Sequence, residues 1–168
     1  MKSDLFWIPG PWPGKLALVP RPRGGDWLED EVCAWRRAGI DLAVSLLERD
    51  EALDLGLDHE AETLRSSGIQ FYSFPISDRS IPASTKEAVF FLDRLAASLA
   101  EGKNVAVHCR QSVGRSGIIA AGLLVKSGMN VDDAIDLVSA ARHQSVPETA
   151  PQLEWIQRLA EERLTLTP

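Results

Sequence analysis

The stretch of sequence that decides the fold reads Val105-Ala106-Val107-His108-Cys109-Arg110-Gln111-Ser112-Val113-Gly114-Arg115-Ser116-Gly117. A short apolar run ends at His-Cys, and a strongly helical sequence follows the glycine and the arginine. This order predicts a strand, a tight loop and the start of a helix. It places Cys109 at the mouth of the loop and Arg115 behind it, an arrangement that can hold a tetrahedral oxyanion and attack it.

Strands and helices alternate along the rest of the chain. The predicted strands cover about residues 5–8, 16–19, 42–47, 69–74 and 104–108, and the predicted helices about 26–38, 58–67, 84–101, 114–126, 130–142 and 150–164. Capping patterns start three of the helices, at Asp26, Ser84 and Asn130, and prolines confine the first two strands to a sheet edge. We expect a single α/β domain over residues 1–168. Its central sheet is mostly parallel, has four to five strands and is flanked by helices on both faces.

Composition and charge narrow the class of protein. The chain has 168 residues and a formal net charge of −6, which argues against a nucleic-acid partner. No apolar run approaches the roughly 20 residues needed to cross a bilayer, and no signal peptide is recognisable. The two cysteines, Cys33 and Cys109, have no metal-type spacing. We therefore expect a cytoplasmic monomer that uses no metal or cofactor and binds no membrane.

The residue types around Cys109 suit phosphate chemistry. A thiol attacks as its thiolate, and loop N–H groups together with the positive end of the following helix would favour that form. The planar guanidinium of Arg115 can bind two phosphate oxygens, Gly114 permits a tight backbone path, and the Ser116 hydroxyl can donate a hydrogen bond to the sulfur. The remaining loop residues would line the bound phosphate: Arg110, Gln111, Ser112 and Val113.

Asp78 is the candidate general acid. It lies in a loop bounded by Pro75 and Pro82, and such a loop can close over a bound substrate. A positioned carboxylic acid can protonate the leaving oxygen and, once ionised, activate water for a second step. The alternative is that Asp78 only forms an Asx-turn before the second proline.

These motifs resemble a known family. His108-Cys109 followed by five residues and Arg115-Ser116 is similar to the signature loop of the protein tyrosine phosphatase superfamily, closest to its dual-specificity branch. Residues 74–82 resemble the general-acid loop of the cyclin-dependent-kinase-associated phosphatase group, and residues 25–28 and 142–149 fit that group as well.

The resemblance implies a role for each matching residue. It implies Cys109 as nucleophile, Arg115 as phosphate clamp, Asp78 as general acid, His108 as a residue that orders the loop, and Ser116 as the hydroxyl behind the sulfur. It also implies the cysteine phosphatase fold and a two-step, metal-free reaction through a phosphocysteine.

Three further residues have two interpretations each. Gln152 could position the hydrolytic water, or it could complete a capping box that starts at Thr149. Arg142 could reach the site or complement the end of its helix, and we favour the helix end. Cys33 is expected in the core, with a regulatory disulfide to Cys109 as the alternative.

The leading hypothesis is a phosphatase for phosphotyrosine, and also phosphoserine or phosphothreonine, in proteins. A phosphoinositide or small-metabolite phosphatase is the main rival, although a loop whose interior holds only one basic residue, Arg110, fits a single phosphate better. A sulfurtransferase would not need Asp78. An inactive phosphate-binding module would have lost either Cys109 or Asp78, and both are present.

Overall fold

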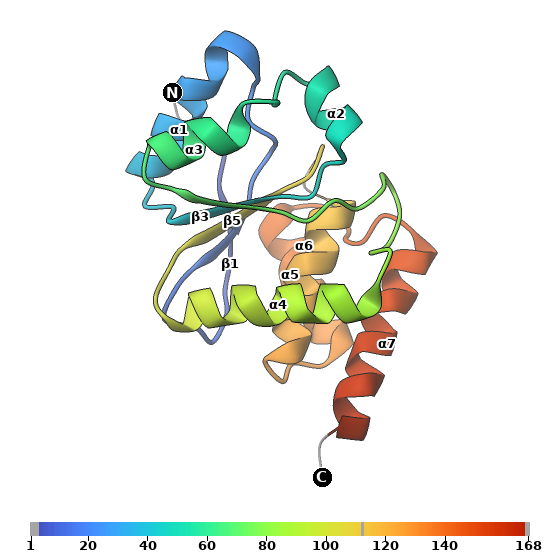
Figure 1. Ribbon diagram of the computed structural model, residues 1–168. Coiled ribbons are helices and arrows are strands. Elements are labelled where there is room, and N and C mark those ends of the chain that lie inside the picture. The colour runs from blue at the N-terminus through green and yellow to red at the C-terminus, as the bar shows by residue number, and fades with distance from the viewer. Residues whose placement is uncertain (1–3, 112, 167–168) are drawn as a thin grey trace.

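The computed structural model describes residues 4–111 and 113–166, and a five-stranded sheet in the order β1-β2-β5-β3-β4 forms its centre (Figure 1). The strands are β1 (Phe6–Ile8), β2 (Leu16–Leu18), β3 (Leu42–Ser45), β4 (Gln70–Ser73) and β5 (Val105–His108). Only β1 runs antiparallel to its neighbour; the pairs β2–β5, β5–β3 and β3–β4 are parallel. The predicted mostly parallel sheet is confirmed.

Register places the carboxyl ends of the parallel strands at one edge of the sheet. Ser45 at the end of β3 pairs with His108 at the end of β5 and with Ser73 at the end of β4. Cys109 follows β5 directly, so it emerges at this edge, where ligands bind in open α/β sheets. One prediction was wrong: β2 lies inside the sheet rather than at its edge. The prolines lie in the turn before β2, so the N–H groups of β2 itself can form hydrogen bonds with the neighbouring strands.

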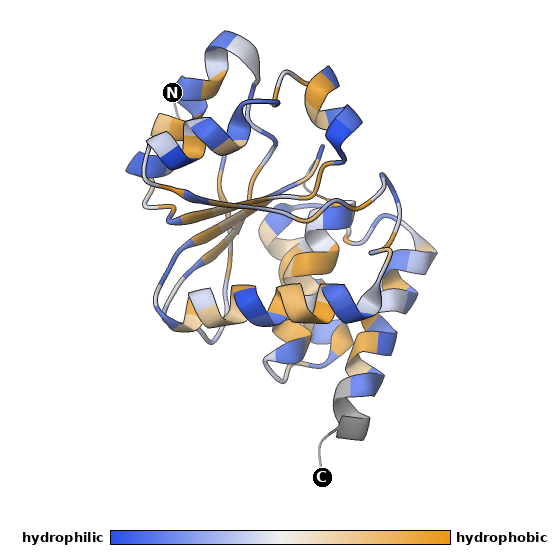
Figure 2. Ribbon diagram, in the orientation of Figure 1, coloured by the Kyte–Doolittle hydropathy of each residue, from blue (hydrophilic) through white to orange (hydrophobic). Residues whose placement is uncertain are grey.

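Helices cover both faces of the sheet (Figure 1). One face carries α1 (Leu28–Arg37) and α3 (Glu60–Ser66), and the other carries α4 (Thr85–Ala100), α5 (Gly114–Lys126), α6 (Val131–Arg142) and α7 (Ala150–Leu166). A short helix, α2 (Arg49–Asp54), follows β3 at the carboxyl edge. Apolar residues recur along the helices and strands (Figure 2), and the buried ones lie between the sheet and the helices, as the hydrophobic effect requires.

Two hydrophobic clusters fill the space between sheet and helices. The cluster under α1 and α3 includes Trp35, and the larger cluster includes the buried residues of α5. Every residue of α5 from Gly114 to Val125 is buried, which is the pattern of a helix that is covered on all sides. The core therefore fixes the strand and the helix that flank the Cys109 loop.

Of the predicted helix caps and buried positions, some are confirmed and others were wrong. The side chains of Ser84 and Asn130 cap α4 and α6 as predicted. Asp26 does not cap α1, because residues Gly25–Trp27 form a 3-10 turn and the helix begins only at Leu28. Cys33 is exposed rather than in the core, because Val32 and Trp35 take the inward positions of α1.

Across the described residues, no helix combines the length and the apolar character that a membrane span requires.

Candidate active site

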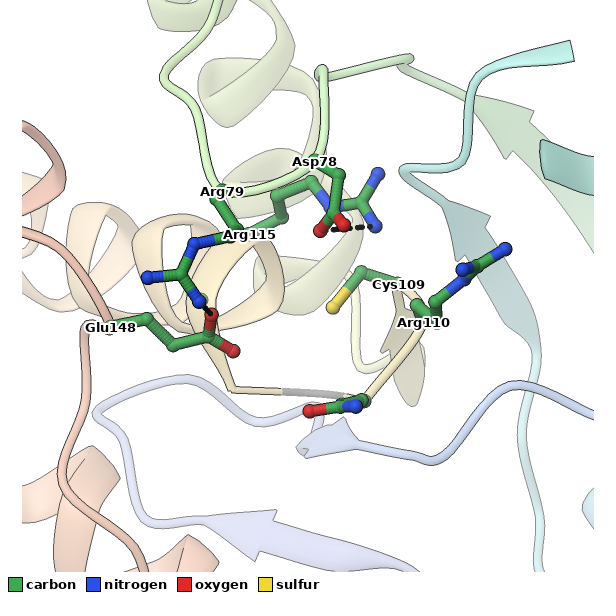
Figure 3. A pocket seen from close by; sticks show the side chains of 8 residues that line it. Asp78, Arg79, Cys109, Arg110, Arg115 and Glu148 are labelled. Atoms are coloured by element: carbon green, nitrogen blue, oxygen red, sulfur yellow. Dashed lines mark hydrogen bonds and ion pairs between the residues drawn. The ribbon is translucent and has the colours of Figure 1, made fainter. Parts of the chain in front are cut away.

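A small pocket opens at the carboxyl edge of the sheet (Figure 3). Its volume is about 90 Å³, and its lining consists of Asp78, Arg79, Cys109, Arg110, Gln111, Gly114, Arg115 and Glu148. The structure thus brings the predicted nucleophile, phosphate clamp and general acid together, although Asp78 lies more than thirty positions upstream of Cys109. Two lining residues, Arg79 and Glu148, were not predicted.

Arg115 is held rigidly at the base of the pocket. Its side chain is only 2% exposed, and its Nη1 and Nη2 atoms donate to Glu51 at 2.7 and 3.0 Å. Nη1 also donates to the carbonyl oxygen of Ile76 at 2.8 Å, and Nη2 lies 3.3 Å from Asp78 Oδ1. Burial alone would lower the pKa of Arg115, but hydrogen bonding to Glu51 and the negative charges of Cys109, Glu51 and Asp78 raise it. The guanidinium therefore stays charged.

Glu51 is the residue that orients Arg115, and sequence reasoning missed it. It lies on α2 and accepts a hydrogen bond from the Glu48 N–H at 3.1 Å. Burial alone would raise the pKa of Glu51, but hydrogen bonds from Arg115 and Glu48 and the charges of Arg115 and Arg110 lower it. The one available signal was the Glu48-to-Glu51 spacing, which is that of a capping box.

His108 lies behind the nucleophile in a fully buried position. Its Nδ1 is 3.2 Å from the Cys109 carbonyl oxygen, and its Nε2 is 2.5 Å from Glu60 Oε1. A carbonyl oxygen can only accept, so Nδ1 carries a hydrogen and donates to it. The buried carboxyl of Glu60, which was not predicted, fixes the other side of the ring. This geometry supports the expectation that His108 orders the loop.

The loop that carries Asp78 is tethered along its length. Ile76 N donates to Leu46 O at 3.0 Å, and Ser77 Oγ donates to Glu48 Oε1 at 2.9 Å. The turn itself is closed by a backbone hydrogen bond from Ser80 N to Ser77 O. The Asp78 carboxylate faces Arg115 (Figure 3), so it is available to the pocket.

Several predicted contacts differ in the structure. Ser116 Oγ is buried and has no hydrogen-bond partner among the described residues, so the predicted bond to the Cys109 sulfur is not formed. Arg142 combines the two expected placements: it stands in the last turn of α6, and its Nη2 also donates to the Gln111 carbonyl oxygen of the signature loop at 2.9 Å. Val113 is buried at the N-cap position of α5, without a side-chain capping bond, and does not line the pocket. Ser112 lies outside the described residues.

Gln152 is fully buried beside the signature loop. Its Oε1 accepts from the N–H groups of Glu148 and Thr149 at 3.1 and 3.2 Å, which is the capping geometry that the sequence allowed. Its Nε2 donates to the Ser80 carbonyl oxygen at 3.0 Å. A role in positioning water stays a prediction.

The described residues hold no cluster of three or more His, Cys, Asp or Glu side chains that could bind a metal ion. Cys33 and Cys109 are both free thiols, so the alternative of a disulfide between them is not realised in this structure.

Two of the known proteins with similar sequences are named as protein tyrosine phosphatases. Protein tyrosine phosphatase domain-containing protein 1 of Danio rerio is 34% identical over 107 residues, which cover 63% of this chain and 15% of that protein. Protein tyrosine phosphatase type IVA 3 of Homo sapiens is 28% identical over 102 residues, which cover 60% of this chain and 57% of that protein. The chain thus spans less than two thirds of the length of either relative.

Solved structures show the same fold. Kinase associated phosphatase, with serine in place of its catalytic-site cysteine, has a TM-score of 0.87 at 17% identity and covers 98% of this chain, which in turn covers 97% of it. Tk-PTP in its active form has a TM-score of 0.75 at 27% identity, with 88% of this chain and 92% of that chain covered.

The family model described as Polymorphic toxin system, DSP-PTPase phosphatase matches residues 19–129, which is more than half of the chain. This segment contains the signature loop and the loop that carries Asp78. The chain belongs to this DSP-PTPase phosphatase family, in the dual-specificity branch of the protein tyrosine phosphatase superfamily.

Proposed function

We propose that the chain hydrolyses phosphomonoesters of phosphotyrosine, and also of phosphoserine or phosphothreonine, in proteins through a phosphocysteine intermediate. One observation carries the proposal: Cys109, Arg115 and Asp78 line the same pocket of about 90 Å³. A nucleophile, an anion clamp and a proton donor in one pocket are the parts that phosphoryl transfer requires. A sulfurtransferase would need only the first two.

In the first step the Cys109 thiolate attacks phosphorus, the P–O bond to the leaving group breaks, and Asp78 gives its proton to the departing oxygen. The start of α5 directs backbone N–H groups at the phosphate. Glu51 and the Ile76 carbonyl oxygen accept from both hydrogens of Arg115 Nη1 and from one hydrogen of Nη2. The hydrogen on Nε and the Nη2 hydrogen that faces Asp78 can therefore be donated to two phosphate oxygens. Phosphate thus replaces Asp78 as the partner of Nη2, and a carboxyl next to the bound dianion favours its protonated form.

In the second step water attacks the phosphocysteine, and the P–S bond breaks to release inorganic phosphate and the thiolate. Asp78, which is now ionised, takes a proton from the attacking water and is ready for the next cycle. Each proton that leaves Asp78 returns to it, so the proton balance of the cycle closes.

The pocket favours a single phosphate. Its small volume fits a phosphoryl group, and the remainder of the substrate has to rest on the surrounding surface. Arg110 at the rim is paired with Glu51 at 3.8 Å, while Asp78 and Glu148 place negative charge around the opening. Arg79 is likewise paired with Glu148, at 3.4 Å, so a substrate with several neighbouring phosphates, such as a polyphosphorylated inositol, would have to displace these carboxylates to gain cationic partners, and this favours a substrate with one phosphate.

The test is hydrolysis of phosphotyrosine and phosphoserine/threonine peptides and phosphoinositides by the wild type and by Cys109→Ser. We expect peptide activity that the variant loses while its circular dichroism spectrum is unchanged. Vanadate should inhibit the wild type, and chelators should not. Full activity of Cys109→Ser would refute the nucleophile, and a preference for phosphoinositides would refute the substrate class. An acidic chain of this kind is further proposed to act as a cytoplasmic monomer without a nucleic-acid partner.

A further inference from the structure

The segment between α6 and α7 and the first turn of α7 contact two adjacent residues of the loop that carries the proposed general acid. Glu148 Oε2 lies 3.4 Å from Arg79 Nη1 (Figure 3), and Gln152 Nε2 donates to the Ser80 carbonyl oxygen at 3.0 Å. Arg79 and Ser80 are the two residues that directly follow Asp78. Glu148 and Gln152 lie beyond the segment that the family model matches.

Backbone conformation indicates that Arg79 is placed for this contact. Its φ angle is 59°, in the left-handed region that residues other than glycine and asparagine rarely adopt. Such conformations persist where the surrounding contacts enforce them, and they cluster at functional sites. In this conformation the Arg79 side chain extends towards Glu148, and the two meet on one side of the pocket (Figure 3).

The segment that holds the loop is itself anchored to the core. Gln152 is fully buried and ties Glu148 and Thr149 to the start of α7 through their N–H groups. Val146 packs against Gly117 of α5 so closely that a Cβ atom at Gly117 would lie 2.1 Å from the valine Cγ1. α5 also carries Arg115, so the proposed acid and the phosphate clamp are positioned from one rigid body.

We propose that Glu148 and Gln152 are positioning residues that hold Asp78 at the mouth of the pocket by retaining Arg79 and Ser80. This rests on the proposed function, in which Asp78 protonates the leaving group. An exposed loop samples many conformations, and a proton donor acts only within hydrogen-bond reach of the leaving oxygen. Retaining the two residues after Asp78 raises the fraction of time that its carboxyl spends within that reach.

The readout is the ratio of kcat/KM for an aryl phosphate with a poor leaving group to that for one with a good leaving group. Good leaving groups need little protonation, so loss of acid positioning lowers this ratio, whereas altered binding of the common phosphate cancels from it. Arg79→Glu and Glu148→Arg should each lower the ratio about three- to fivefold, the range expected for a partly exposed ion pair. The double variant Arg79→Glu/Glu148→Arg restores the pair with reversed charges and should recover most of the ratio.

Gln152→Glu tests the second contact. Glutamate can still accept the two N–H groups that cap α7, but its other carboxylate oxygen would face the Ser80 carbonyl oxygen, where no hydrogen bond is possible. Because this contact is buried, we expect the ratio to fall by about tenfold. The buried carboxylate should also lower the midpoint of thermal unfolding, so the ratio is measured well below that midpoint, where the variant is fully folded and the effect on positioning is separated from a failure to fold.

The ion pair between Asp93 and Lys126 supplies a matched control. Its side chains are 59% and 23% exposed, compared with 66% and 25% for Arg79 and Glu148, and it lines no part of the pocket. Asp93→Lys and Lys126→Asp should leave the leaving-group ratio unchanged.

Asp78→Asn calibrates the experiment, because it should lower the ratio more than any other variant. If Asp78→Asn lowers the ratio while the Arg79, Glu148 and Gln152 variants match the wild type, the positioning proposal is overturned and the proposed function stands. If Asp78→Asn also has no effect on the ratio, the general-acid assignment fails and the positioning proposal falls with it. A ratio that falls in the single variants and recovers in the double variant supports the proposal.

Discussion

Glu51→Gln is the most informative single substitution, because Glu51 is the carboxylate that orients the buried arginine. The change keeps the size of the side chain and removes its charge. Arg115 would then retain the Ile76 carbonyl as its neutral partner and would lose one of its two bonds to position 51. The prediction is a loss of both stability and activity.

The structure sets the size of both effects. Two charge-assisted hydrogen bonds of 2.7 and 3.0 Å join Glu51 to Arg115, and each bond of this kind contributes roughly 1.5–3 kcal/mol. An amide still offers one oxygen, so we expect a loss of about 2–3 kcal/mol, below the roughly 3–5 kcal/mol for removing a buried partner outright. If about 2 kcal/mol of this orientation is also missing in the transition state, kcat/KM falls about 30-fold.

Chemical denaturation at neutral pH measures the first quantity, and hydrolysis of an aryl phosphate measures the second. Asp50→Asn is the matched control, because Asp50 precedes Glu51 on the same helix, is exposed and undergoes the same change of charge. Its stability and activity should stay near those of the wild type. If Glu51→Gln behaves like this control, the argument that Glu51 orients Arg115 is refuted.

Three further substitutions or conditions test neighbouring features. The pKa of Glu51 in the folded protein lies below its ordinary value of 4.5. The stability advantage of the wild type over Glu51→Gln should therefore be fully present above pH 4.5 and should shrink as the pH falls through the pKa of Glu51 in the folded protein. A difference in the free energy of unfolding that stays constant across this pH range would contradict the prediction. Gly117→Ala should destabilise the protein by about 1–3 kcal/mol in thermal unfolding, because the new methyl would overlap Val146, and a stabilised variant would show that the contact yields freely. Glu60→Ala leaves His108 Nε2 without its buried hydrogen-bond partner and should cost about 1–3 kcal/mol, more than Glu60→Gln in the same assay, and equal stabilities would show that the pair does not stabilise the fold.

Sequence reasoning was most accurate where a structural decision is local. The start of α5 at Gly114 and the caps at Ser84 and Asn130 were predicted at their residues. In each case a few neighbouring residues determine the local structure. A run of apolar residues marks the buried helix α5, and at the two caps a polar side chain accepts from an N–H three positions later.

It failed where a decision depends on residues far apart in the chain. Glu51 acquires its importance from Arg115, which lies 64 positions away, and its helix α2 has only six residues and none that is buried. No hydrophobic period marks such a helix. The sequence around Glu60 similarly gives no sign that this acid is buried, and only the fold places it against His108.

Arg142 shows a third kind of difficulty. It occupies the last turn of α6, as a residue that complements a helix end would, and it also reaches the Gln111 carbonyl of the signature loop. The two interpretations of the sequence describe a single placement, because that helix ends beside the loop.

The burial of α5 on all sides has a consequence for how the protein fails under heat. The same helix supplies the anion site at its first turn and the centre of the larger hydrophobic cluster along its length. The anion site at the start of α5 therefore cannot loosen without opening the core. The loop that carries Asp78 and the helix α2, which has no buried residue, can be displaced while the core stays intact, so a partly damaged sample can hold molecules that still bind phosphate but turn it over slowly.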